Sequence, residues 1–177
     1  MAKVRGNIIQ LTASLMSLYP DAQKSADDAL FKECGKHWKE LKIDDFYETK
    51  LWDLMMTAYS KASIQGENAL LTVGKKIYPT IKAAGQIPKE IDSALKMIKF
   101  EADGFVLYHK GPDVIPRKFL KADEGDVIVL APSPGYNCKV IEGVYLGILK
   151  MFGKNGTVVQ EKCVKKGDST CQYHISW

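Results

Sequence analysis

The stretch NCKVIEGVYLGILKMF (residues 137–152) decides the fold together with the two runs that follow it, GTVVQEKC (156–163) and STCQYHIS (169–176). Apolar residues recur at helical spacing in the first stretch, which predicts a helix. The two later runs alternate apolar and polar residues on either side of a Lys-Lys-Gly-Asp turn, so they predict an antiparallel hairpin. Alternation places Cys171, Tyr173 and Ile175 on one face and His174 on the other.

Upstream of this stretch the sequence is mostly helical. Apolar periodicity predicts helices over 4–18, 21–41, 47–62, 67–84 and 88–98, with Pro79 expected to kink the fourth or end it early. Two short strands are predicted over 100–109 and 126–131. We therefore expect one α+β domain over 1–177, with a helical part (1–98) and a part (99–177) in which a helix crosses a small antiparallel sheet.

Composition excludes several classes of protein. The net charge of +4 comes from 25 basic and 21 acidic residues scattered along 177 positions, which argues against a nucleic-acid partner. The apolar runs are short and interrupted by Lys, Asp or Gly, so no membrane span is expected. No secretory hydrophobic region follows Met1, and a cytoplasmic location is expected.

Three of the four cysteines are concentrated in the last quarter of the chain. Cys138 opens the helix over 137–152, and Cys163 and Cys171 flank the turn of the hairpin. A helix N-terminus and the two arms of a hairpin can meet at one point, which is how thiolates are collected around zinc. In a reducing compartment these cysteines are expected to be metal ligands or core thiols. Cys34 is expected to be a half-buried apolar residue.

The same region resembles the four-vinyl-reductase domain family. The resemblance covers about 40 residues and is carried by the spacing of seven positions: Cys138, Gly143, Gly153, Cys163, Gly167, Asp168 and Cys171. It implies a fold shared with haem-nitric-oxide/oxygen-binding domains and transport-particle subunits. It also implies a small-molecule-binding module in which the three cysteines and an upstream glutamate hold a structural zinc ion.

The sequence does not identify the fourth zinc ligand. Glu142 is the first candidate because it lies one helical turn from Cys138 on the same side of the helix. Glu124 and Asp126 are further candidates. His174 lies three residues after Cys171, but strand alternation directs it to the opposite face.

Haem is an alternative cofactor. The haem-nitric-oxide/oxygen-binding domains, which this chain resembles in helix order, use a Tyr-x-Ser-x-Arg triad for the haem propionates just before the helix that Cys138 opens. The corresponding positions here hold Ala131, Ser133 and Gly135. Only His37 and His109 precede this segment as possible axial ligands, and His109 is expected to end a strand on the surface.

We expect a cytoplasmic small-molecule-binding domain with a sensory or regulatory role and a structural zinc site. The alternatives are a haem-based gas sensor and a tetrapyrrole-processing protein. No phosphate loop, nucleophile elbow, zinc-protease or dinucleotide motif is present, so no enzyme activity is expected. The expected ligand is a hydrophobic or aromatic molecule lying between the helix over 47–62 and the sheet, near Trp52, Met55, Met56, Tyr59, Tyr78, Phe105 and Tyr145. Two protein partners are considered: a separate signalling protein, and a second copy paired through residues 8–18.

Overall fold

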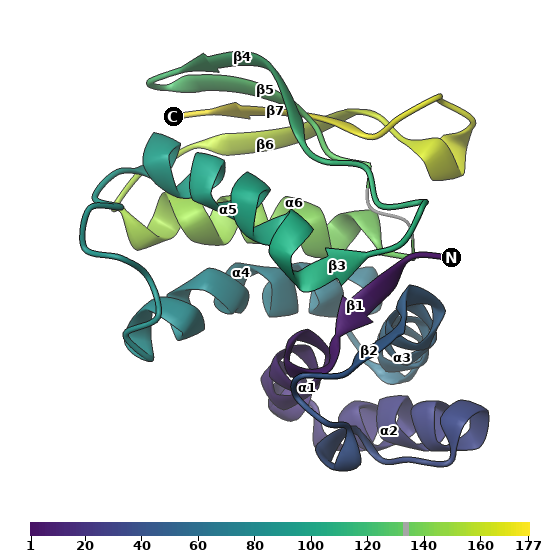
Figure 1. Ribbon diagram of the computed structural model, residues 1–177. Coiled ribbons are helices and arrows are strands. Elements are labelled where there is room, and N and C mark those ends of the chain that lie inside the picture. The colour runs from purple at the N-terminus through teal and green to yellow at the C-terminus, as the bar shows by residue number, and fades with distance from the viewer. Residues whose placement is uncertain (133–134) are drawn as a thin grey trace.

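A computed structural model describes residues 1–132 and 135–177 and shows an α+β fold (Figure 1). This confirms the fold class expected from the sequence, with helices first and a four-stranded antiparallel sheet at the end. The elements in chain order are β1 (Lys3–Arg5), α1 (Gly6–Leu15), α2 (Pro20–Cys34), β2 (Phe46–Glu48), α3 (Thr49–Ala62), α4 (Glu67–Ala83), α5 (Ala94–Tyr108), β3 (His109–Lys110), β4 (Lys118–Asp123), β5 (Asp126–Leu130), α6 (Cys138–Met151), β6 (Thr157–Lys162) and β7 (Gln172–Ser176).

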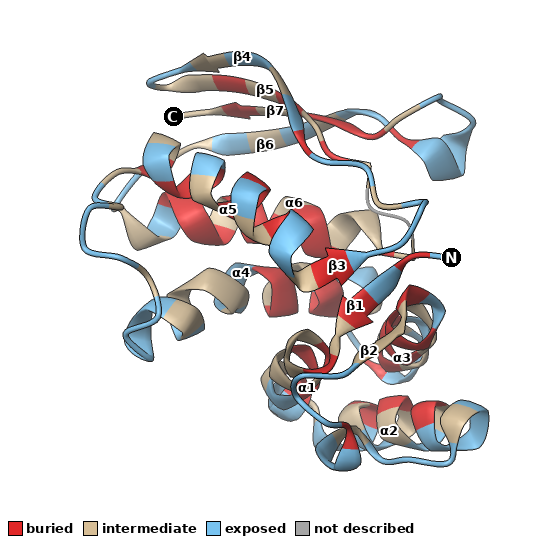
Figure 2. Cartoon of the chain, viewed as in Figure 1, coloured by how far each residue is buried: buried red, intermediate tan, exposed pale blue. Residues whose placement is uncertain are grey.

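The larger sheet has the strand order β4-β5-β7-β6, and every neighbouring pair is antiparallel. Val127 pairs with Ile175 and Val129 pairs with Tyr173, and all four side chains are buried. In Figure 2, β5 and β7 carry buried (red) segments, and the helices lie on one side of this sheet. The alternation in residues 169–176 therefore reflects a sheet with one covered face.

Helix α6 lies between this sheet and α4 (Figure 1). The side chain of Asn137 caps its N-terminus by accepting a hydrogen bond from the Lys139 N–H. Glycines allow α4 and α6 to pack in backbone contact, because a Cβ on Gly143 would lie 2.3 Å from the carbonyl oxygen of Leu71. A Cβ on Gly74 of α4 would lie 2.2 Å from the Val140 oxygen. These two helices consequently form a closely packed layer beneath the sheet.

The predicted strand over 100–109 is wrong, and of the predicted helix over 88–98 only residues 94–98 are helical. One helix, α5, runs through Ala94–Tyr108, and the Oγ of Ser93 accepts a hydrogen bond from the Lys96 N–H at its start. Its buried positions follow helical spacing, namely 94, 97, 98, 101, 102 and 105. The strand paired with β5 on its outer side is β4, which the sequence analysis did not predict.

A second sheet forms at the N-terminal end of the molecule, in the order β2-β1-β3. The first two residues of the predicted helix over 4–18 belong to β1 instead, because β1 extends to Arg5 and α1 begins at Gly6. The inner side of α1 packs within the domain, where Ile9 and Ala13 are buried. The inner side of residues 8–18 is therefore covered by their own domain, and pairing with a second copy stays a prediction.

Helix α4 continues to Ala83 and so extends four residues beyond Pro79. Among the described residues, no helix is both long and apolar enough to cross a bilayer.

Candidate functional site

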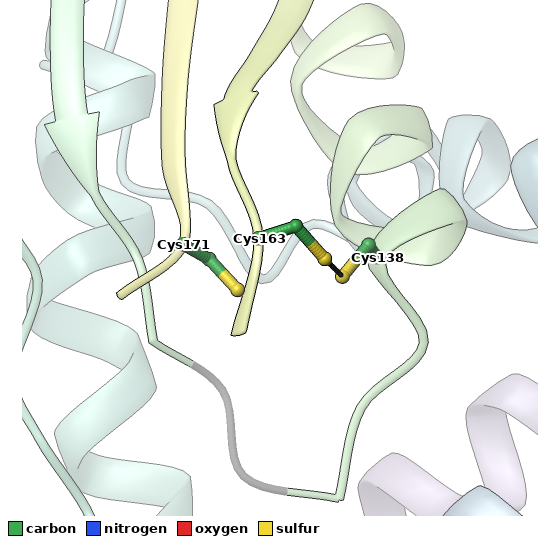
Figure 3. Close-up of side chains that lie close together, drawn as sticks. All are labelled: Cys138, Cys163 and Cys171. Atoms are coloured by element: carbon green, nitrogen blue, oxygen red, sulfur yellow. Dashed lines mark hydrogen bonds between the residues drawn. The ribbon is translucent and has the colours of Figure 1, made fainter. Parts of the chain in front are cut away.

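The three cysteines of the C-terminal region come together at one end of the large sheet (Figure 3). Cys138 is the first residue of α6, Cys163 follows β6 and Cys171 precedes β7. Their sulfur atoms all lie within 4.8 Å of one another, and the Sγ atoms of Cys138 and Cys163 are 3.5 Å apart. The helix and hairpin geometry thus produces a set of sulfur atoms compact enough to share one metal ion.

The thiols of this cysteine cluster differ in acidity. A hydrogen bond from Cys171 is the largest cause that lowers the pKa of Cys138 to about 5, with smaller contributions from Gln160, Cys163 and Tyr173. The same hydrogen bond raises the pKa of Cys171 above its ordinary value, and burial adds to this. The backbone N–H of Cys163 donates to the Asp168 carboxylate over 2.7 Å, which fixes the hairpin turn beside the cluster. One thiolate is therefore stabilised by a neighbouring thiol.

The acidic residues considered for a fourth ligand bind other partners. Glu142 accepts a hydrogen bond from Lys139 Nζ at 2.7 Å, and Asp126 binds Lys121 and His174 on the sheet. Within the described residues, the possible metal-binding set at this position consists of the three cysteine sulfurs, without a histidine or carboxylate close enough to join them. Glu124 accepts from the Trp177 indole.

Gln160 is a neighbour of the cluster that the sequence analysis missed. Its side chain contributes to the low pKa of Cys138, and its buried Nε2 has no other hydrogen-bond partner among the described residues. Its signal in the sequence is its position three residues before Cys163, near the end of β6.

A cavity of about 410 Å³ lies among α1, α4 and α5, with walls completed by α3, α6 and the segment before α6. Of the seven residues expected to bind a ligand, Trp52, Tyr78 and Phe105 line this cavity. The other four, Met55, Met56, Tyr59 and Tyr145, are buried and do not line it. No strand of the large sheet contributes to the described lining, so the position of the cavity differs from the expected one between residues 47–62 and the sheet.

An ion pair is buried in the cavity wall. The side chains of Glu101 and Arg117 are only 7% and 1% exposed, and Arg117 Nη2 lies 2.9 Å from Glu101 Oε1. A second hydrogen bond joins Arg117 Nε to Glu101 Oε2 at 3.4 Å, and the Tyr145 hydroxyl donates to the same oxygen. The guanidinium also lies 3.9 Å from the centre of the Phe105 ring. The two charges are therefore neutralised within the protein.

His109 is buried beside this pair, and the expectation that it lies on the surface is wrong. Its Nδ1 lies 2.7 Å from the carbonyl oxygen of Phe105, which can only accept, so Nδ1 carries the proton. Nε2 then accepts a hydrogen bond from the Tyr136 hydroxyl. Burial lowers the pKa of His109 to about 4, which keeps the imidazole neutral at neutral pH.

One polar atom of the cavity wall has no partner. The Oδ1 of Asn7, in the first turn of α1, is buried and makes no hydrogen bond within the described part of the chain. A buried acceptor of this kind costs about 1 to 3 kcal/mol. Sequence reasoning did not identify Asn7, Glu101, Arg117 or Tyr136, because their proximity depends on the packing of segments far apart in the chain.

No family model and no curated protein matches the sequence. Solved structures of H-NOX proteins do match its fold. The unliganded Fe(II) H-NOX protein from K. algicida is 12% identical, with a TM-score of 0.71 over 97% of this chain and 95% of that one. The S. oneidensis H-NOX protein in the Fe(II)NO state is 13% identical, with a TM-score of 0.70 over 97% and 98% of the two chains. An oxygen-binding H-NOX domain related to soluble guanylate cyclases is 12% identical, with a TM-score of 0.69 over 97% and 94%.

These comparisons overturn the resemblance to the four-vinyl-reductase family, because the structures that match are H-NOX domains over nearly their full length. The cysteine and glycine spacing misled for a physical reason. Gly143 is required by the contact between α4 and α6, and Gly167 has a φ of 98° after the hairpin turn, so both serve the backbone geometry of the fold. A helix followed by a hairpin can bring three cysteines together in any chain with this topology. The chain has the H-NOX fold.

Proposed function

We propose that this chain is a sensory domain that binds a small molecule in the cavity among α1, α4 and α5 and signals this binding to a separate protein. The observation that carries the proposal is a cavity of about 410 Å³ with buried polar groups in its wall. Pockets of this size with a few fixed polar groups are typical of ligand sites. The H-NOX structures that match this fold include an Fe(II)NO form and an oxygen complex, which favours haem-based gas sensing over a function centred on zinc.

The cavity contains one group that fits haem. His109 is neutral and buried, and its Nδ1–H is held by a backbone carbonyl, as in many histidines that bind metal through Nε2. In this structure, however, Nε2 accepts the hydrogen bond from Tyr136. His37 lies away from the cavity on the surface, where it binds Asp27.

The groups that would hold haem propionates are not present in the described part of the cavity. Ser133 lies outside the described residues, and Ala131 offers no polar side chain. Gly135 has a φ of 76°, and a Cβ there would lie 2.6 Å from Thr49 Oγ1, so an arginine could not replace it without rearrangement. The one cationic side chain in the described lining is Arg117, which is already paired with Glu101. The residues present therefore do not fit haem held by the triad.

A cavity-filling variant tests the proposed function. Ile8→Trp adds an indole to a side chain that lines the cavity, whereas Leu18→Trp adds one at a position that is 52% exposed. Thermal shift assays with hemin and with a panel of hydrophobic small molecules should find compounds that raise the melting temperature of the wild type. The shift should be lost in Ile8→Trp and kept in Leu18→Trp. A panel without any stabilising compound, or a shift that persists in Ile8→Trp, would contradict the proposal.

We also propose that the cysteine cluster binds structural zinc. Three sulfurs within 4.8 Å of one another, already partly ionised through Cys138, are a donor set that zinc favours. Elemental analysis should find one zinc per chain in the wild type and in Cys34→Ser, whose thiol lies outside the cluster, and none in Cys163→Ser. Equal metal content in all three proteins would refute the site.

A further inference from the structure

The charges around the cavity determine what can bind there. The charged side chains of the described lining are Glu101, Arg117 and Asp103. The first two neutralise each other inside the wall, and Asp103 is exposed. An anionic ligand would find no free cation and would lie near a carboxylate. Burying a charge without a partner is strongly unfavourable, so the lining selects against anions.

The hydrogen-bonding groups indicate a ligand that donates. The hydroxyl of Tyr136 is bonded to His109, and the indole N–H of Trp52 donates to Thr12 Oγ1 at 3.1 Å. Within the described lining, the buried polar atom without a hydrogen-bond partner is Asn7 Oδ1, which can only accept a hydrogen bond. A ligand N–H or O–H placed against Asn7 would remove the cost of that unsatisfied acceptor.

The size of the cavity excludes a site made for one diatomic molecule alone. A water molecule accounts for about 30 Å³ of liquid volume, whereas the cavity holds about 410 Å³. Its remaining surface is largely aliphatic and aromatic, with Ile8, Leu11 and Ile77 on one side and Phe100 and Phe105 on the other. This surface is suited to a molecule of two or three rings.

We infer that the cavity binds an uncharged, ring-containing molecule that donates a hydrogen bond to Asn7, in place of haem. The inference rests on the proposed function, because it names the class of ligand for the same cavity. Its basis is that the chain has an H-NOX fold but a lining that does not fit haem. In the described lining, the cation Arg117 is already paired with Glu101, and the buried atom without a partner, Asn7 Oδ1, is a hydrogen-bond acceptor.

A set of matched probes tests charge and hydrogen bonding separately. N-phenyl-naphthylamine is uncharged and carries one N–H, anilinonaphthalenesulfonate adds an anionic group to the same skeleton, and benzylnaphthalene replaces the N–H by a CH2 group. Fluorescence titration should show saturable binding of the amine, with about tenfold weaker binding of the sulfonate and of the hydrocarbon, equivalent to about 1.4 kcal/mol each. Asn7→Ala should abolish the preference for the amine over the hydrocarbon while leaving the bias against the sulfonate.

Hemin provides the opposing test. The inference expects hemin to give no stoichiometric Soret band, in the wild type and in Asn7→Ala alike. A stoichiometric band that shifts on adding nitric oxide would overturn the inference and leave the proposed sensory function standing. Equal or tighter binding of the sulfonate would also overturn the inference. If none of these four compounds binds saturably, or if Ile8→Trp binds them as the wild type does, the proposed function itself fails.

Discussion

Glu101→Gln should be among the most destabilising conservative substitutions in this chain. The change keeps the shape of the side chain but removes the negative charge that faces Arg117 across 2.9 Å. The guanidinium remains charged because its pKa cannot fall far enough to release a proton. It would then lose its carboxylate partner, since the new amide and the Pro132 carbonyl oxygen are neutral acceptors. Breaking one side of a buried ion pair costs about 3 to 5 kcal/mol, a large part of the roughly 5 to 15 kcal/mol that stabilises a typical domain.

Urea unfolding followed by circular dichroism measures this loss. The control is Asp28→Asn, which breaks the exposed ion pair between Asp28 and Lys24 on α2, 2.6 Å apart, and should leave the unfolding midpoint unchanged. The double variant Glu101→Leu with Arg117→Met should recover much of the stability, because it leaves no charge without a partner. If Glu101→Gln unfolds at the same urea concentration as Asp28→Asn, the ion pair does not contribute to the fold as argued.

Three further predictions follow from the glycines, His109 and the cysteine cluster. Gly143→Ala should lower the free energy of unfolding by about 1 to 3 kcal/mol, because its Cβ would overlap the α4 backbone. Gly104→Ala should raise the free energy of unfolding by about 0.5 to 1 kcal/mol, because a Cβ added there meets no atom within 4 Å. Urea unfolding of both variants tests these values. The folded protein takes up a proton on His109 only near its pKa of about 4, while the unfolded chain does so near about 6.5. Stability from this group is therefore lost as the pH falls between these values, by about 2 kcal/mol from about pH 7.5 to pH 5, and urea unfolding of His109→Gln should lack this component. Removing zinc with a chelator should lower the melting temperature of the wild type but leave that of Cys163→Ser unchanged, as calorimetry would show.

The part of the fold after residue 136 could be predicted from local patterns. Residues 137–152 were expected to form a helix, and α6 covers Cys138–Met151. The two strands of the hairpin, β6 and β7, also lie within the predicted runs. In α6 the less buried positions recur at helical spacing, and in β7 the apolar positions Tyr173 and Ile175 are buried, so the periodicity of the sequence reflects the environment there. In β6 the alternation is between half-buried and exposed residues.

The region before α6 could not be assigned in the same way. Residues 100–109 contain three aromatic residues and Val106, which favour a strand, and Gly104, which weakens the case for a helix. In the structure, α5 is packed against α6 on one side and lines the cavity on the other, so its apolar residues cover more than one face. Tertiary packing overrides the local preference here, and the cap at Ser93 was the available signal.

The cysteine cluster and the cavity differ in how far the sequence reveals them. The cysteine cluster is formed where β6 ends, where β7 begins and where α6 begins, so its assembly follows from the topology of these three elements. The cavity wall combines α1, α4, α5 and Arg117 from beyond β3. Glu101 and Arg117 are 16 residues apart without a recognisable motif. A shared fold therefore leaves the chemistry of the cavity undetermined, because the side chains at these positions are set independently of the backbone.

The two sites are nevertheless connected by a continuous series of contacts. The Tyr145 hydroxyl of α6 donates to Glu101 in the cavity wall, and the Tyr145 ring lies 5.7 Å from the ring of Tyr173 in β7. The Tyr173 hydroxyl donates to the backbone oxygen of Cys138 at 3.4 Å. The first turn of α6, which carries Cys138, is thus joined to the cavity wall through two fully buried tyrosines, Tyr145 and Tyr173.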